Sequence, residues 1–363
     1  MATLPGVACG AGQPPPGPAQ LAGQRVVYPF AGTTVPSWLR DRIRRGEAGA
    51  VLLFAGNGTD AAAVRRLTDE LQAIPRPAAF DAPLLVMTDQ EGGPVRRLTG
   101  APEAGAGRLS ARPVAASRAA GDGAGRLLCR AGVNVNLAPV VDLARPGSVI
   151  AAQGRSFGRS PVQVARRAVA FALGMAPWGV LAAPKHFPGL GPAIRTTDDI
   201  AVTLTTPGAE LRRADERPYR ALIARGVPLV MVGTAGYRAF GPRPAALNPR
   251  VVEGELRERL GFEGVVVSDA LDTPALEASG DHGTVAVLAA GAGVDLLLYA
   301  DPAAARAAAD GIALGLRDGT VSEARARASL ERVLSLRRAL DGSGPSMSGP
   351  LAARPPAPGR PAC

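Results

Sequence analysis

Short, continuous runs of apolar residues recur along this chain between longer segments rich in Ala, Leu and Arg. Such runs are typical of strands buried on both faces of a parallel sheet, and the longer segments have helical spacing. The alternation predicts βα units, and 363 residues can form a single (β/α)8 barrel of the TIM type, an α/β fold. The expected strands are residues 50–54, 84–88, 133–137, 180–183, 229–232, 264–267 and 294–299, with a short eighth near 154–157. The clearest expected helices are residues 60–74, 161–175, 210–225 and 322–340.

The two ends of the chain differ in composition from the region between them. Residues 1–20 and 342–363 are rich in Pro, Gly and Ala and have little hydrophobic periodicity. Segments of this kind cannot bury enough apolar surface to offset the entropy of ordering them. We therefore expect disordered tails at 1–20 and 342–363, flanking one barrel domain at 21–341.

The net charge of +10 raises the question of nucleic-acid binding. The basic residues are scattered along the expected helices, however, and few aromatic residues are interleaved with them, so no nucleic-acid partner is expected. Of the 41 basic residues only Lys185 is a lysine, which indicates a compositional bias and not a binding surface. No cofactor is expected, and no metal site, because the two histidines are far apart in the sequence.

The sequence contains no run of about 18 uncharged apolar residues, so no transmembrane helix is predicted. The first residues lack the charged and apolar regions of a signal peptide. As written, the chain is expected to be cytoplasmic and a monomer. A misplaced start codon would make it secreted or a lipoprotein, since a Val-Ala-Cys sequence lies at residues 7–9.

Polar side chains follow several of the expected strands directly. Asp89, Asp142, the pair Lys185-His186, and Asp269 all lie at or just beyond a strand end. A single such aspartate, Asp89 or Asp269, could be a helix N-cap. Several charged groups meeting at the carboxyl ends of barrel strands would be desolvated unless they face one another or a ligand, so together they indicate a site for a polar ligand.

Five motifs give this pattern a more specific meaning. They are Asp89-Gln-Glu-Gly-Gly with Val95 and Arg97, Asn136-Leu-Ala-Pro-Val-Val-Asp142, Arg155-Ser-Phe-Gly, Lys185-His-Phe-Pro-Gly, and Gly261-Phe-Glu-Gly-Val-Val-Val-Ser-Asp269. In order and spacing they resemble the N-terminal barrel domain of glycoside hydrolase family 3, in particular its bacterial β-N-acetylhexosaminidases. The resemblance covers about residues 21–340. It implies a carbohydrate substrate, and specifically glycans or cell-wall fragments that contain N-acetylglucosamine.

The resemblance implies roles for individual residues. Asp269 corresponds to the catalytic nucleophile, which forms a covalent glycosyl-enzyme and gives retention of configuration. The positions that match sugar-binding residues of the family are Asp89, Arg97, Arg155, Lys185 and His186. Arg97 and Arg155 could instead form surface salt bridges, and His186 could be a core histidine. Lys185 is harder to explain structurally, because the chain uses arginine everywhere else.

The resemblance fails at the general acid/base. In the family, the loop after Lys-His-Phe-Pro-Gly carries a second histidine and then an Asp-x-His dyad. Here Leu190 stands at the first histidine, Thr196 at the aspartate of the dyad and Asp198 at its histidine. Two explanations remain open: either Asp198 or Asp199 is the acid, or the barrel binds sugar with little turnover. A Schiff-base aldolase with Lys185 as nucleophile, and a non-catalytic glycan receptor, are further alternatives.

Overall fold

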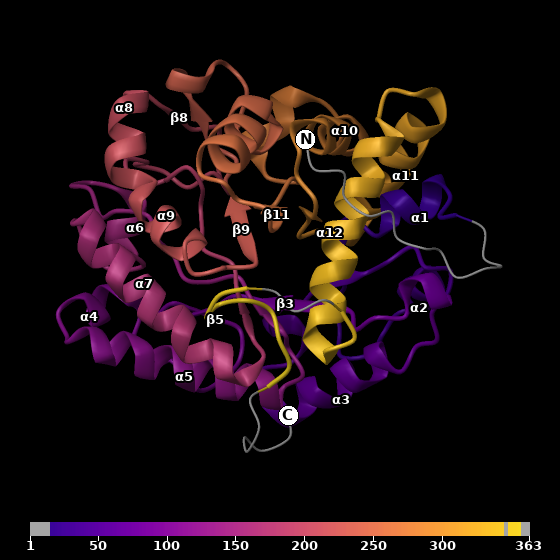
Figure 1. Cartoon of the computed structure of the whole chain (residues 1–363), viewed down its shortest axis with the longest axis horizontal. Helices are drawn as coiled ribbons and strands as arrows, with labels where there is room; N and C mark the ends of the chain where they lie inside the picture. Colours follow the sequence, from indigo (N-terminus) through magenta and orange to yellow (C-terminus); the bar gives the residue numbers. More distant parts are fainter. Residues whose placement is uncertain (1–14, 345–347, 357–363) are drawn as a thin grey trace.

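The computed structural model describes residues 15–344 and 348–356, and its centre is a curled parallel sheet (Figure 1). Six strands form this sheet in the order β12–β1–β2–β3–β6–β7, and β9 pairs in parallel with β11. The strands are β1 (Val26–Pro29), β2 (Ala50–Leu52), β3 (Leu85–Thr88), β6 (Val135–Asn136), β7 (Leu181–Ala182), β9 (Leu229–Val232), β11 (Val265–Ser268) and β12 (Leu297–Leu298). Two small pairs are β4 (Gln90–Gly92) with β5 (Val95–Arg96), antiparallel, and β8 (Thr203–Leu204) with β10 (Gly236–Tyr237), parallel.

Single parallel bridges connect the six-stranded sheet to the β9–β11 pair. One joins Phe187, beyond β7, to Val232 of β9, and the other joins Val267 of β11 to Leu296, beside β12. Backbone hydrogen bonds accompany both bridges: the amide of Phe187 donates to Met231, at 2.8 Å, and that of Ser268 donates to Leu296, at 2.9 Å.

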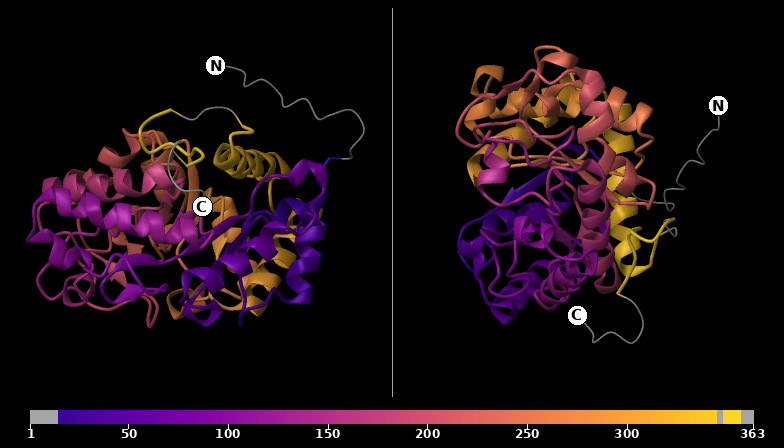
Figure 2. Two further views of the ribbon diagram at one scale, coloured as in Figure 1. Left: turned by 90° about the horizontal axis from the view of Figure 1, so that it is seen from below. Right: turned by 90° about the vertical axis from the view of Figure 1, so that its left-hand side faces the viewer.

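Helices lie on the outside of these strands in all three views (Figures 1 and 2). Several begin with a side-chain cap, such as Asp60 before α3 and Ser160 before α7, which satisfies a free N–H of the first turn. The α-helices are α1 (Pro18–Gly23), α2 (Ser37–Arg44), α3 (Ala61–Gln72), α4 (Ala106–Ser110), α5 (Val114–Arg130), α6 (Val149–Ala152), α7 (Pro161–Met175), α8 (Gly208–Glu210), α9 (Arg217–Ile223), α10 (His282–Ala292), α11 (Pro302–Asp318) and α12 (Glu323–Asp341). The π-helices are η4 (Leu211–Asp215) and η7 (Arg250–Arg259), and the 3-10 helices are η1 (Ala55–Asn57), η2 (Ala78–Phe80), η3 (Ala176–Trp178), η5 (Arg238–Phe240), η6 (Ala245–Leu247) and η8 (Pro274–Ser279).

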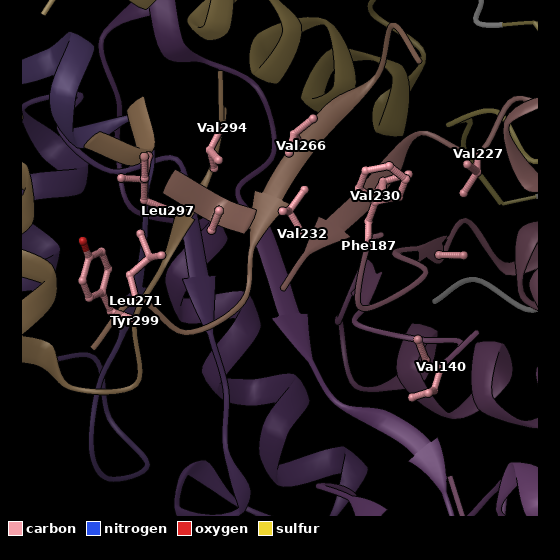
Figure 3. Packing of buried hydrophobic residues seen from close by; sticks show 14 of the residues in the cluster. Val140, Phe187, Val227, Val230, Val232, Val266, Leu271, Val294, Leu297 and Tyr299 are labelled. Atoms are coloured by element: carbon pink, nitrogen blue, oxygen red, sulfur yellow. The ribbon is translucent and has the colours of Figure 1, made fainter. Parts of the chain in front are cut away.

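Successive residues of each strand are buried in two different clusters. Val230 and Val266 pack in the large cluster between the strands and the outer helices, part of which Figure 3 shows. Their neighbours Leu229 and Val265 belong to a second cluster, which α12 joins through Val333. Burial on both faces explains why the strands are continuous apolar runs and do not alternate with polar residues.

The predicted α/β class is confirmed, as is a parallel sheet. Each of the seven clearest expected strands contains or overlaps an observed one. The eighth, near 154–157, was wrong: these residues form a turn and bends between α6 and α7, with Gly154 at a φ of 65°. Of the eight strands in the six-stranded sheet and the β9–β11 pair, β1 is the one that sequence analysis missed, because it is short and ends at a proline, Pro29.

The limits of the expected tails were also partly wrong. Helix α1 begins at Pro18 and packs beside α11, so the N-terminal and C-terminal parts of the domain lie together (Figures 1 and 2). Near the other end, Leu351 and Ala353 are buried, and the amide of Leu351 donates to Arg225. The rest of these tails, 1–14, 345–347 and 357–363, lies outside the described residues. Within the described ranges, no helix is long and apolar enough to span a membrane.

Arg337 of α12 is fully buried and ties this helix to the N-terminal half of the domain. Its Nε donates to the carbonyl of Pro83 at 2.8 Å, its Nη1 to Oε1 of Gln24 at 2.6 Å, and its Nη2 to the carbonyls of Phe80 and Ala82 at 2.9 and 2.6 Å. Burial lowers the pKa of Arg337 to about 9. The buried charge is therefore stabilised mainly by these acceptors.

We predict that Arg337→Leu lowers the free energy of unfolding by about 3–5 kcal/mol, because it leaves several buried acceptors without a donor. Urea denaturation would measure the loss. The neighbouring Arg338 is partly exposed and is the matched control, since Arg338→Leu should cost less than about 1 kcal/mol. Equal effects of the two substitutions would contradict this assignment.

Candidate active site

A cavity of about 450 Å³ lies at the carboxyl ends of the central strands. Phe54 lies beyond the end of β2, Asp89 directly follows β3, and Asp269 directly follows β11. Lys185 lies three residues beyond β7. Because parallel strands end on the same side of a sheet, side chains distant in sequence meet here. The polar side chains of the lining are Asp89, Glu91, Arg97, Gln153, Arg155, Lys185, His186, Thr196, Thr197, Asp198 and Asp269.

Lys185 lies at the centre of a buried charge cluster. Its Nζ is 2.7 Å from Oδ1 of Asp89 and 2.8 Å from Oε1 of Glu91. Arg155 donates to both oxygens of Glu91, at 2.9 and 2.8 Å, and Arg97 donates to Asp89 at 3.2 Å. Only 4% of the Lys185 side chain and 6% of the Glu91 side chain are exposed. These ion pairs fix the positions of all five side chains.

The charges in this cluster determine its protonation. Burial alone would raise the pKa of Asp89 and Glu91, but Lys185 and Arg155, joined by Arg97 for Asp89, outweigh it and hold both pKa values below their usual range. Burial alone would lower the pKa of Lys185, yet the two carboxylates raise it. Lys185 therefore carries a positive charge, and a protonated amine cannot attack a carbonyl, which argues against the aldolase hypothesis.

His186 is oriented by a buried carboxylate, that of Asp142. The Nδ1 atom of His186 is 2.7 Å from Oδ2 of Asp142, while Oδ1 of Asp142 accepts hydrogen bonds from the backbone amides of Leu190 and His186. A proton on Nδ1 is favoured by this contact and leaves Nε2 directed at the cavity, 3.9 Å from Oδ2 of Asp269. His186 therefore belongs to the cavity and not to the apolar core.

Asp269, like Asp198, is a carboxylate of the cavity lining that forms no ion pair with a lysine or arginine of the described residues. Its backbone amide donates to Val232 at 2.8 Å, which anchors it between two strands, and its Oδ1 accepts from the amide of Ala270 at 2.9 Å. Burial raises the pKa of Asp269; His186 and Lys185 partly oppose this effect and Asp198 adds to it. The other oxygen, Oδ2, stays available to a ligand.

The loop that departs from the family pattern forms one wall of the cavity. Leu190, Thr196, Thr197 and Asp198 line it. Thr197 is held by a hydrogen bond from the hydroxyl of Thr273, and the hydroxyl of Thr196 donates to Oδ2 of Asp198 at 3.0 Å. Asp198 is solvent-exposed at this wall. Asp199 is exposed as well, but it is not part of the lining.

Of the site residues predicted from the sequence, the structure brings together all except Asp199. Sequence analysis assigned no role to Glu91, which pairs with Lys185, or to Asp142, which orients His186. Both lie in the quoted motifs, at or just beyond a strand end, so the signal that located Asp89 was present for them too. Gln153 gave no such signal, and it enters the site through a hydrogen bond from Arg155 at 3.1 Å.

Comparison with known proteins decides the family. Residues 30–336 match the profile described as the N-terminal domain of glycosyl hydrolase family 3. The chain belongs to this family. The match confirms the family expected from the motifs, and with it the prediction that the chain is a glycosidase.

Relatives and solved structures agree with this assignment. An uncharacterized secreted glycosyl hydrolase of Arthroderma benhamiae is 37% identical over 89% of this chain and 94% of its own length, and a β-hexosaminidase of Thioalkalivibrio sulfidiphilus is 33% identical over 75% and 79%. The β-N-acetylhexosaminidase of Beutenbergia cavernae superposes with a TM-score of 0.82 at 31% identity, over 89% and 99% of the two chains. A family 3 β-N-acetylglucosaminidase of Paenibacillus gives 0.82 at 34%, but this chain spans only 64% of it.

We predict that Lys185→Met lowers the free energy of unfolding at pH 7 by about 3–5 kcal/mol, because two buried carboxylates lose their shared cation. The pKa values of Asp89 and Glu91 are depressed in the folded protein, so their contribution to stability is present at neutral pH and disappears on acidification. The loss of unfolding free energy caused by Lys185→Met should therefore be smaller at a pH well below 4 than at pH 7. Denaturation at both pH values would test this, and a loss that does not depend on pH would contradict it.

Proposed function

We propose that this chain is a retaining β-glycoside hydrolase, specifically a β-N-acetylhexosaminidase that acts on N-acetylglucosamine-containing glycans or cell-wall fragments. The observation that carries the proposal is Asp269, an anchored carboxylate with one free oxygen in a cavity where the neighbouring carboxylates Asp89 and Glu91 are already paired with cations. The names of the Thioalkalivibrio and Beutenbergia relatives support the sugar class. The description of the Arthroderma relative as secreted favours export among the locations that the sequence left open.

In the proposed reaction, Oδ2 of Asp269 attacks the anomeric carbon while the bond to the leaving group breaks and an acid protonates the departing oxygen. Water then attacks the glycosyl-enzyme, gives its proton to the same group, and releases the sugar with its original configuration. Asp89 and Glu91 accept hydrogen bonds from sugar hydroxyls. Arg97, Arg155, Lys185 and His186 bind hydroxyls of the same sugar ring.

The two isolated bridges support a barrel closed by eight strands, β1, β2, β3, β6, β7, β9, β11 and β12. In this proposal, the bridge between Phe187 and Val232 and that between Val267 and Leu296 complete the ring. Both bridges lie close in sequence to site residues, since Phe187 follows His186 and Val267 lies two residues before Asp269. Closure of the barrel would thereby place the nucleophile and the Lys185 cluster on one rim.

We infer that Asp198 is the general acid/base. It lines the cavity, and its charge contributes to the raised pKa of Asp269, so the two carboxylates act on one another across the same space. The alternative, a catalytically weakened sugar-binding barrel, differs in one respect: it has no group to protonate the leaving oxygen.

Asp269→Ala is expected to abolish hydrolysis of an aryl N-acetylglucosaminide and to leave the fold intact. Azide should restore part of the activity by attacking the vacated face, and the glycosyl azide should have the inverted configuration, in contrast to the retained product of the wild type. NMR spectroscopy would assign both anomers. Full activity of the variant would disprove the role of Asp269.

Asp198→Ala should slow glycosides with poor leaving groups by about 10²–10⁴-fold and change activated aryl glycosides much less, because only poor leaving groups need protonation. Asp199→Ala is the matched control and should retain the wild-type dependence, since Asp199 is exposed but does not line the cavity. For the wild type and the two variants, the rates of hydrolysis would be plotted against the pKa of the leaving group and compared. If Asp198→Ala behaves like the wild type, another group is the acid; if the wild type itself turns over only activated substrates, the weakened-barrel alternative is correct.

A further inference from the structure

A second depression lies on the outer helical layer, along α7 where it runs between α5 and α9 (Figure 1). Its volume is about 390 Å³, and none of its residues lines the sugar cavity. The lining residues are Val114, Arg118, Val162, Ala165, Arg166, Val169, Ala170, Leu173, Arg217, Ala221 and Arg225, which we call the arginine groove. Its chemistry is unlike that of the active site, because it contains no carboxylate.

The floor of the arginine groove is apolar. Val162 is 40% exposed, one of the few large hydrophobic side chains on the described surface with so much exposure. Ala165, Val169 and Ala170 are buried below it and Leu173 is half-buried. Along α7, Val162 and Leu173 are eleven residues apart, which corresponds to about 16 Å of helix. The groove therefore offers an elongated apolar strip to a ligand.

Four arginines surround this strip, and all four are exposed: Arg118 on α5, Arg166 on α7, and Arg217 and Arg225 in the segment of α9. Some surface arginines, such as Arg65 and Arg327, pair with a carboxylate four residues away, whereas others, such as Arg126, do not. None of these four forms an ion pair within the described residues. The residues outside the described ranges contain no Asp or Glu.

We propose that the arginine groove binds a single-chain amphiphile with an anionic headgroup, such as an alkyl phosphate or a fatty acid. The guanidinium groups would pair with the headgroup oxygens, which match the fork of an arginine, and the alkyl chain would cover the apolar strip. The volume lies within the range of small-molecule sites.

Titration calorimetry on the full chain tests this proposal, with dodecyl phosphate kept below its micellar concentration as the probe. One equivalent should bind at low salt, and binding should weaken as salt screens the arginines. Dodecyl maltoside and dodecyltrimethylammonium provide the same chain with a neutral and a cationic headgroup, and inorganic phosphate provides the anion alone. All three should bind at least about tenfold more weakly than dodecyl phosphate. The maltoside and the trimethylammonium probe lack an anionic headgroup, and inorganic phosphate lacks the alkyl chain.

Two sets of variants locate the binding. Arg166→Gln and Arg217→Gln should each weaken dodecyl phosphate by about tenfold, the loss expected when one hydrogen bond to a charged group is removed. Ala221→Leu should weaken it by filling the groove while leaving its charge unchanged. Arg126→Gln, an exposed arginine of α5 outside the groove, is the matched control and should change nothing.

Glycosidase activity and thermal unfolding of each variant should equal those of the wild type, because the groove and the sugar cavity share no residue. Absence of saturable binding, equal binding of the cationic probe, or equal effects of Arg126→Gln and Arg166→Gln would each overturn the proposal. Loss of hydrolysis in the Asp269 variant bears only on the active site, so the two proposals can fail separately.

Discussion

The ion pairs of Lys185 with Asp89 and Glu91 are the interaction on which the candidate active site depends. Lys185 lies beyond β7, and the two carboxylates lie beyond β3, so their ammonium–carboxylate contacts of 2.7 and 2.8 Å join two sectors of the sheet. With Arg97 and Arg155 the cluster holds three cations and two carboxylates. The excess positive charge favours a further anion in the same cavity, and Lys185 indeed opposes the rise in the pKa of Asp269. A compact ammonium can contact two carboxylates at once, whereas a planar guanidinium would require more space.

Asp142 has a comparable role for His186, the residue that follows Lys185. Its side chain is fully buried, and its two oxygens hold the ring and amide of His186 and the amide of Leu190. The first residues of the 190–199 loop are therefore fixed by a carboxylate beneath the site, while Ile194 and Asp198 farther along the loop are exposed. The side chains of Lys185, Asp89, Glu91 and His186 are therefore held by ion pairs and hydrogen bonds. Asp198 is exposed, and it lies in the loop where the sequence departs from the family.

Much of this arrangement could be predicted from particular residues. The Val-Val-Val-Ser run before Asp269 identified a strand buried on both faces and a carboxylate at its end, and Lys185 was conspicuous as the only lysine. In contrast, the short strand predicted near 154–157 does not form, because the hydroxyl of Ser156 binds the carbonyls of Asp142 and Gly158 in an irregular segment. Strand β1 was missed because four residues ending at Pro29 carry little local signal, and pairing with β2 and β12 is what makes them a strand.

The sequence by itself determined the α/β class, most of the strands and the family, and seven of the eight predicted site residues line one cavity, because each of these depends on local apolar patterning or on motifs at strand ends. Only the tertiary structure decided that Glu91 shares Lys185 with Asp89, that Asp142 orients His186, and that Asp198 but not Asp199 faces the cavity. It also decided that arginines of α5, α7 and α9 surround one groove. These relations join residues up to about a hundred positions apart, and only the folded chain fixes the directions in which their side chains point.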